Sequence, residues 1–248
     1  MRFKQYILQE SRSKVISEDE AYSLIEKNCK KAIKAYFKDI KMWRGIHNKN
    51  PYLYIDPKKF TRKSKDNDNY YTLINDNASC WKDYPKRSQS IVCSTSMRDS
   101  QDYGSPYIVL PYDGAKIGVA PAFDYWSSFI DELDMNLNNF VLTLKNVFKS
   151  LNIPLSDKSY KDMAKSFKAF DKLVRKTEVI SMLPRMNHYD GDLLKHFEQL
   201  MCPKNNYFEL KTIDKITEKS VEVWTDSESI LLASDKQQEF EERFQHLS

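Results

Sequence analysis

Residues 90–96 read Ser90-Ile91-Val92-Cys93-Ser94-Thr95-Ser96, an apolar run that ends in three hydroxyl residues. Because β-branched residues favour extended backbone, this run predicts a buried strand. Before it, residues 42–46 (Met-Trp-Arg-Gly-Ile) predict a strand that carries one arginine, and after it, residues 221–224 (Val-Glu-Val-Trp) predict a strand that carries one glutamate. Further strands are expected at 106–110, 116–119, 207–210 and 229–233, the first two as a hairpin across Asp113-Gly114.

Helices are expected on both sides of these strands. Ser17 stands three residues before Glu20, the capping-box spacing, and apolar residues then recur at three- and four-residue steps. This pattern predicts an amphipathic helix over 18–38. Similar stripes predict helices within 124–200 and a charged helix at 235–244. The fold class expected is α+β: one domain over 11–248 with a helical insertion at about 124–201.

Composition excludes several protein classes. The 248 residues are 41% hydrophobic and 30% charged, which is typical of a globular chain. No segment approaches the ~18–20 uncharged apolar residues of a membrane span, so no membrane partner is expected. Five glycines form neither the GxGxxG nor the GxxxxGK[ST] loop of nucleotide-binding folds. The four cysteines and four histidines lack metal-ligand spacing, so no metal site is expected either.

Charge is distributed unevenly along the chain. Residues 1–100 contain 21 Lys and Arg against 12 Asp and Glu, a net charge of +9, whereas the remainder contains 18 against 23, a net charge of −5. A basic half suits ligands that carry phosphate. A solvated lysine-rich surface accounts equally for the bias and is the commoner reason for it.

Arg44, Ser94 and Glu222 form a candidate site because each lies in a predicted strand. Taken singly, each has a commoner structural explanation. A strand arginine usually forms an ion pair, a run of serine and threonine usually ends a strand, and a strand glutamate usually faces solvent. The order and spacing of the three together carry more information than any one of them.

Together these residues resemble the arginine–serine–glutamate class of ADP-ribosyltransferases. The motifs that carry the resemblance are Arg44-Gly45, Ser94-Thr95-Ser96 and Glu222-Val223. The resemblance spans about residues 18–233, with the helical insertion outside the pattern. It implies a split mixed β core with surrounding helices. It also implies that NAD is a substrate, whose ADP-ribose passes to a host protein or nucleic acid.

The resemblance implies a role for each residue near NAD. Glu222 would stabilise the oxocarbenium-like charge that develops when the nicotinamide–ribose bond breaks. Arg44 would bind the diphosphate, for which its planar multi-donor fork is suited. Gly45 would let the nicotinamide carboxamide approach the backbone.

The hydroxyl residues and a nearby tyrosine have supporting roles by the same resemblance. Ser94 would hold the strands and the glutamate in position through hydroxyl hydrogen bonds, with Thr95 and Ser96 supporting it. A ring such as Tyr103 or Tyr107 would stack on nicotinamide, although either side chain is also suited to a core.

Two features leave alternatives open. Members of the class often carry Glu or Gln two positions before the catalytic glutamate, where this chain has Ser220, so an acceptor other than arginine is open. Glu209, flanked by Phe208 and Leu210, competes with Glu222 as the catalytic residue. Glu222 is preferred because two short strands, 221–224 and 229–233, fit the family pattern around it.

The first ten residues resemble the capsid-targeting peptide of internal head proteins in T-even-type phages. They read Met1-Arg2-Phe3-Lys4-Gln5-Tyr6-Ile7-Leu8-Gln9-Glu10 and end in the cleavage-site pattern Leu8-Gln9-Glu10. The resemblance implies removal of residues 1–10, and a location in the virion interior or the bacterial host cytoplasm. An ordinary frayed start to the first helix is the alternative.

A mono-ADP-ribosyltransferase is the function expected from these features. Two alternatives belong to other classes. The first is a non-catalytic injected phage protein that binds and inhibits a host defence factor. The second is an NAD glycohydrolase, in which water is the acceptor.

Overall fold

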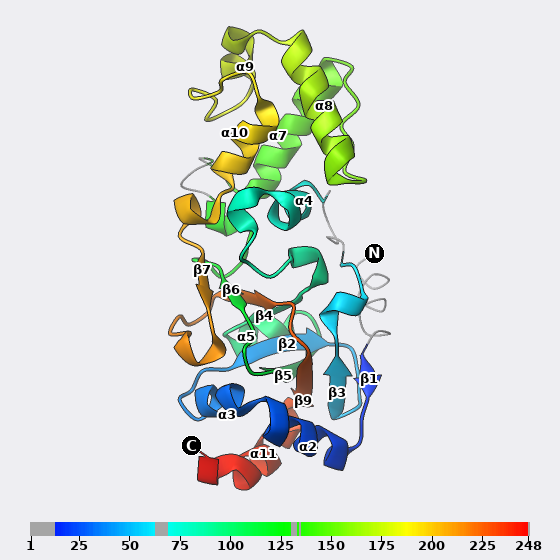
Figure 1. Cartoon of the computed structure of the whole chain (residues 1–248), viewed down its shortest axis with the longest axis vertical. Helices are drawn as coiled ribbons and strands as arrows, with labels where there is room; N and C mark the ends of the chain where they lie inside the picture. The colour runs from blue at the N-terminus through cyan, green and yellow to red at the C-terminus, as the bar shows by residue number, and fades with distance from the viewer. Residues whose placement is uncertain (1–12, 63–68, 130–132, 134, 248) are drawn as a thin grey trace. The chain divides into compact units, whose positions relative to one another are not determined.

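The computed structural model describes residues 13–62, 69–129, 133 and 135–247 (Figure 1). The chain divides into two compact units. Unit 1 comprises residues 1–62, 84–123 and 210–248, and unit 2 comprises residues 63–83 and 124–209. The N-terminal decapeptide and its cleavage pattern lie outside the described residues.

One antiparallel sheet organises the strands. In the described residues its order is β1-β3-β9-β5-β2-β4-β8-β6-β7 (Figure 1). The strands are β1 (Lys14–Val15), β2 (Met42–Ile46), β3 (Tyr52–Ile55), β4 (Ile91–Ser94), β5 (Ser105–Pro111), β6 (Ile117–Val119), β7 (Glu209–Lys211), β8 (Glu222–Thr225) and β9 (Ser229–Ala233). The α+β class is confirmed.

The sheet departs from the mixed core that was expected. The pairings β1–β3, β2–β4, β2–β5, β3–β9, β4–β8, β5–β9 and β6–β8 are all antiparallel. Each of them joins strands that are not consecutive in the chain. Strand direction is therefore set by long-range pairing, which the residue pattern within a single strand does not encode.

The helix expected over 18–38 is two helices, α2 (Glu18–Asn28) and α3 (Lys30–Tyr36). The predicted cap is confirmed, since the Ser17 side chain accepts a hydrogen bond from the Glu20 N–H at 3.2 Å. Cys29 separates the helices, with φ −119° and ψ 31°. The break creates a second set of helix N-terminal N–H groups, which need acceptors.

Asp113 supplies those acceptors, and the hairpin expected across Asp113-Gly114 is wrong. The Asp113 carboxylate accepts hydrogen bonds from the N–H groups of Lys30 and Lys31 at 3.2 and 2.8 Å. A carboxylate at a helix N-terminus also meets the positive end of the helix dipole. The turn after β5 is thus tied to α3, while β5 pairs with β2 and β9, and β6 pairs with β8.

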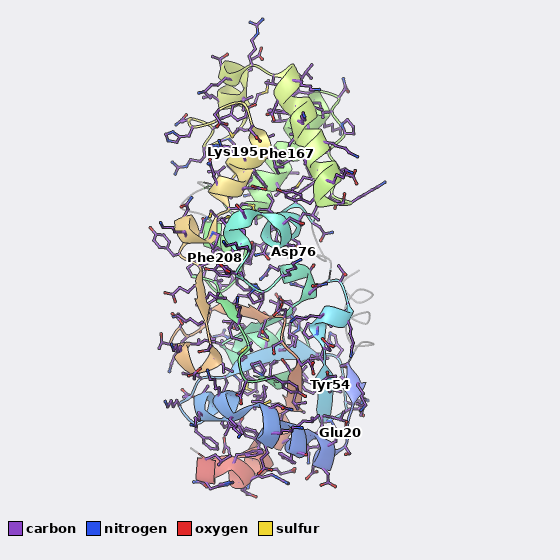
Figure 2. The ribbon with its side chains drawn as sticks, viewed as in Figure 1. Glu20, Tyr54, Asp76, Phe167, Lys195 and Phe208 are labelled. Carbon is purple, nitrogen blue, oxygen red and sulfur yellow. The ribbon has the colours of Figure 1, made fainter. Side chains whose placement is uncertain are left out.

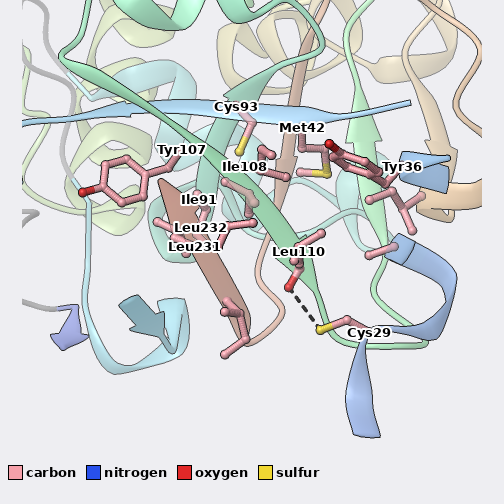
Figure 3. Close-up of a cluster of buried hydrophobic side chains, with 14 of the residues drawn as sticks. Cys29, Tyr36, Met42, Ile91, Cys93, Tyr107, Ile108, Leu110, Leu231 and Leu232 are labelled. Carbon is pink, nitrogen blue, oxygen red and sulfur yellow. Dashed lines mark hydrogen bonds between the residues drawn. The ribbon is translucent and has the colours of Figure 1, made fainter. Parts of the chain in front are cut away.

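The core of unit 1 lies between the sheet and its helices, and Figure 3 shows part of it. Residues from α2, α3, several strands and α11 (Gln237–Phe244) contribute to one buried apolar cluster. Two cysteines are in the cluster, and the Cys29 thiol donates to the Leu110 carbonyl at 3.5 Å (Figure 3). Burial raises the pKa of the Cys93 thiol to about 12, so Cys93 is a protonated core residue at neutral pH.

Unit 2 is helical and has an aromatic core. The α-helices among its described residues are α4 (Tyr70–Asn77), α7 (Leu137–Ser150), α8 (Tyr160–Leu173), α9 (Lys176–Met182) and α10 (Leu193–Leu200). Phe167 on α8 (Figure 2) contacts Phe148 and Phe197, with ring centroids 5.6 and 5.8 Å away. Asn136, Ser159 and Asp192 cap α7, α8 and α10. None of the described helices is both long and apolar enough to cross a membrane.

Candidate active site

Three strands that are neighbours in the sheet, β2, β4 and β8, carry the principal residues of the predicted site. β4 lies between β2 and β8, and Ser94 on β4 stands directly opposite Glu222 on β8. Ser94 also stands opposite Trp43 on β2. Directly opposite residues of an antiparallel pair present their side chains side by side on one face. The fold therefore brings Ser94 and Glu222 together, and strand alternation places Arg44, the next residue of β2, toward the other face.

The Glu222 carboxylate is paired with a buried arginine that the sequence patterns did not indicate. Arg87 lies in the 3₁₀ turn η3 (Arg87–Gln89), and its Nη2 donates to Glu222 Oε1. The Arg87 side chain is 3% exposed and that of Glu222 is 14% exposed. The Arg87 guanidinium also lies 5.0 Å from the centre of the Trp224 ring. Glu222 is thus held by a charge-assisted hydrogen bond from the protein interior.

The hydrogen bonds of Ser94 and Thr95 differ from those that were expected. Ser94 Oγ donates to Asp99 Oδ2 at 3.0 Å and accepts from the Ser96 N–H at 2.9 Å. Thr95 makes the bond toward the glutamate strand, because its Oγ1 accepts from the Val221 N–H at 3.1 Å. The Thr95 N–H in turn donates to the Val221 carbonyl at 3.0 Å. Thr95 therefore fixes the residue that immediately precedes Glu222.

Ser96 anchors the short helix that follows β4. Its hydroxyl caps α5 (Met97–Gln101) by accepting from the Asp99 N–H at 3.4 Å. Asp99 was not singled out as part of the site. The spacing Ser96-x-x-Asp99 is a capping-box signal and could have indicated it.

The Arg44 side chain bridges β2 and β4 where the two strands stop pairing. β2 pairs with β5 from Met42 to Ile46, whereas its pairing with β4, in the described strands, is at Trp43. Arg44 is partly buried, and its Nη1 donates to the Val92 carbonyl at 2.9 Å. The side chain thus supplies a donor to a β4 carbonyl beyond the last ladder position shared with β2.

Gly45 is required by the neighbouring turn. A Cβ on Gly45 would lie 2.0 Å from the Ser100 carbonyl oxygen and 2.9 Å from atoms of Tyr103. The space beside its Cα is therefore filled by the end of α5 and the turn that follows it. Tyr103 is 45% exposed, whereas Tyr107 is buried, with its hydroxyl 2.8 Å from the Asn50 carbonyl. Of the two rings, only Tyr103 has an exposed surface on which another ring can stack.

Replacing Gly45 by alanine should destabilise the protein for this steric reason. Overpacking of this kind costs about 1–3 kcal/mol, and the closest clash is with a backbone carbonyl oxygen, which cannot rotate away as a side chain can. Urea unfolding followed by tryptophan fluorescence would measure the loss. An unchanged midpoint for Gly45→Ala would show that the turn moves freely and that packing does not explain the glycine.

The two competing glutamates have different surroundings. Glu222 begins β8 opposite Ser94, whereas Glu209 begins β7 at the edge of the sheet and is exposed. Ser220 precedes Glu222 by two positions and has φ 56°, in the left-handed region that few side chains favour. Ser220 itself is exposed.

The described residues contain no group of three or more His, Cys, Asp or Glu placed to hold a metal ion. No protein-family model, curated protein or solved structure gives a significant match to the chain.

Proposed function

We propose that the chain is a mono-ADP-ribosyltransferase that uses NAD. The observation that carries the proposal is the alignment of Ser94 and Glu222 on adjacent strands, with Arg44 on the next strand. Ser94 and Glu222 are far apart in the sequence, and nothing in a generic α+β fold requires them to lie opposite each other. The pairing of Ser94 on β4 with Glu222 on β8, next to the strand that carries Arg44, supports the resemblance that the order of the three residues suggested.

The chemistry assigned to Glu222 follows from its charge. When the bond between ribose C1′ and nicotinamide breaks, nicotinamide leaves with the bonding electron pair and positive charge develops on the ribose. A carboxylate fixed beside the ribose 2′-hydroxyl stabilises that charge. The acceptor nucleophile then forms a bond to C1′ and releases its proton. The split β core, in which β2 and β4 separate next to the site, belongs to the same proposal.

Arg44 is assigned to the diphosphate of NAD, and Arg44→Lys should weaken NAD binding. Lysine keeps the charge but loses the planar fork. Because a hydrogen bond to a charged group contributes about 1.5–3 kcal/mol, the Kd for NAD should rise about tenfold or more. Calorimetry in the Glu222→Gln background would measure this without consuming NAD.

Arg98→Lys provides the matched control, because Arg98 is exposed on α5 in the same unit. The Kd of Arg98→Lys for NAD should equal that of the parent. If Arg44→Lys binds NAD as tightly as the parent does, another residue holds the diphosphate.

The experiment that tests the proposed function is incubation with NAD labelled in its adenylate phosphate and a bacterial lysate. Label that becomes attached to macromolecules indicates transfer, and protease or nuclease treatment then identifies the acceptor class. Release of free ADP-ribose alone would indicate a glycohydrolase. Absence of both products would favour a non-catalytic binding protein. Glu222→Gln is the control for contaminating activity in the preparation.

A further inference from the structure

Arg87 is a buried cation in the short turn η3 (Arg87–Gln89). Its side chain is 3% exposed, and its Nη2 donates to the Glu222 carboxylate. Removing a charge from water is costly, and a buried ion pair often stabilises a fold no more than apolar residues would. The pair therefore calls for an explanation besides stability.

The surroundings of Arg87 fix the direction of its guanidinium. The guanidinium carbon lies 5.0 Å from the centre of the Trp224 ring, within the range of a cation–π contact. The ring is itself held, because Trp224 Nε1 donates to the Pro85 carbonyl at 3.0 Å. Gly118 on β6 packs against the same ring so closely that a Cβ there would lie 2.3 Å from it. The guanidinium that donates to Glu222 is thus supported by a ring that is itself held in place.

We propose that Arg87 is a positioning residue for ADP-ribosyl transfer, which acts by fixing the orientation of the Glu222 carboxylate. This inference rests on the proposed function. A carboxylate held in advance needs no reorganisation when positive charge develops on the ribose, and that preorganisation is the source of electrostatic catalysis. Arg87 acts through Glu222 and is too deeply buried to be assigned a contact with substrate.

A double-mutant cycle tests this role. Arg87→Met keeps most of the side-chain volume over Trp224 and removes the guanidinium. In the parent protein it should lower kcat by about 10²-fold, the scale of a misplaced catalytic group. The Kd for NAD should change less than about twofold, because Arg87 does not hold NAD. In the Glu222→Gln background the same substitution should change kcat less than about twofold, since the negative charge that Arg87 positions is already absent.

Two further variants separate positioning from folding. Arg87→Lys keeps the positive charge and should restore part of the lost kcat. Arg243→Met is the matched control, because Arg243 lies 4.6 Å from the Tyr22 ring in the same unit, away from Glu222. It should leave kcat unchanged. Urea midpoints for all variants would show that each is folded under assay conditions.

Several outcomes would overturn the inference. One is a wild-type kcat in folded Arg87→Met. Another is a loss of kcat that is equal in the parent and Glu222→Gln backgrounds, which would indicate a general structural effect. If Arg87→Met does not fold, a folded Arg87→Lys with wild-type kcat and the same NAD affinity would overturn it as well. An inactive parent protein would instead refute the proposed function, and the inference with it.

Discussion

Glu222→Gln should lower the rate of ADP-ribose transfer by about 10²–10³-fold, the usual loss when one electrostatic stabiliser of a transition state is removed. The glutamine amide has nearly the same size and keeps an acceptor oxygen for Arg87, but it lacks the negative charge. The loss should therefore fall on kcat, while the Kd for NAD stays close to that of the parent. Single-turnover kinetics with labelled NAD, together with calorimetry, would separate the two quantities.

Stability should also fall in this variant, because the charge of buried Arg87 loses its counter-charge. Because the amide retains the hydrogen bond, the loss in free energy of unfolding should be smaller than the roughly 3–5 kcal/mol that breaking a buried ion pair costs. Assays must therefore be run well below the unfolding midpoint. Replacing Arg87 as well removes the buried cation, so the double variant Arg87→Met and Glu222→Gln should recover part of this stability.

Glu209→Gln is the matched control, since Glu209 is an exposed strand glutamate on β7. It should transfer ADP-ribose at the parent rate and unfold at the parent midpoint. If Glu209→Gln is inactive while Glu222→Gln is active, the catalytic assignment belongs to Glu209. If both variants are fully active, the binding-protein alternative replaces the enzyme.

Trp224→Ala should lower the free energy of unfolding by about 3–5 kcal/mol, the cost of deleting a buried tryptophan side chain. Trp224 is fully buried, and it contacts Arg87, Gly118 and the Pro85 carbonyl. Total stability is typically about 5–15 kcal/mol, so this loss leaves part of the protein unfolded at ordinary temperatures if the parent is at the low end of that range. Activity should also fall in the fraction that remains folded, because Arg87 loses the ring against which its guanidinium packs.

Trp126→Ala is the comparison for this prediction. Trp126 is partly exposed in unit 2, with its ring centroid 4.3 Å from that of Tyr71. Trp126→Ala should lower the free energy of unfolding by less than Trp224→Ala does. The substitution should also leave the Glu222 site intact. Urea unfolding at equilibrium would measure the stability of both variants. Equal losses in the free energy of unfolding would contradict the prediction that Trp224 contributes more stability than Trp126.

The strands of the site could be predicted because each is encoded locally. The β-branched run before Ser94 has few alternatives to extended backbone, and β4 ends at Ser94, where the hydroxyl residues begin to cap α5. The Ser17 cap is also local, since its donor and acceptor lie three residues apart. Such features depend on neighbours along the chain, which the sequence shows directly.

Other features depend on residues that are distant in the sequence. The break at Cys29 is accompanied by capping from Asp113, a residue assigned from sequence to a hairpin turn. Arg87 lies in a short polar turn with no periodic pattern, and its importance comes from Glu222. Neither partnership produces a recurring spacing, so no pattern in the sequence could have indicated it.

The pairing of β2 with β4 at Trp43 and Ser94 has a consequence for motion. A sheet opens most readily where the fewest ladder hydrogen bonds must break, and strands on either side of such a line behave as separate cooperative units. Amide hydrogen exchange should therefore report one protection level for β5 and β9 and another for β8. Arg44 and Glu222 belong to strands on opposite sides of this line. A dinucleotide held by both would join the two sides, so its binding should slow amide exchange at the β2–β4 boundary more than elsewhere in the sheet.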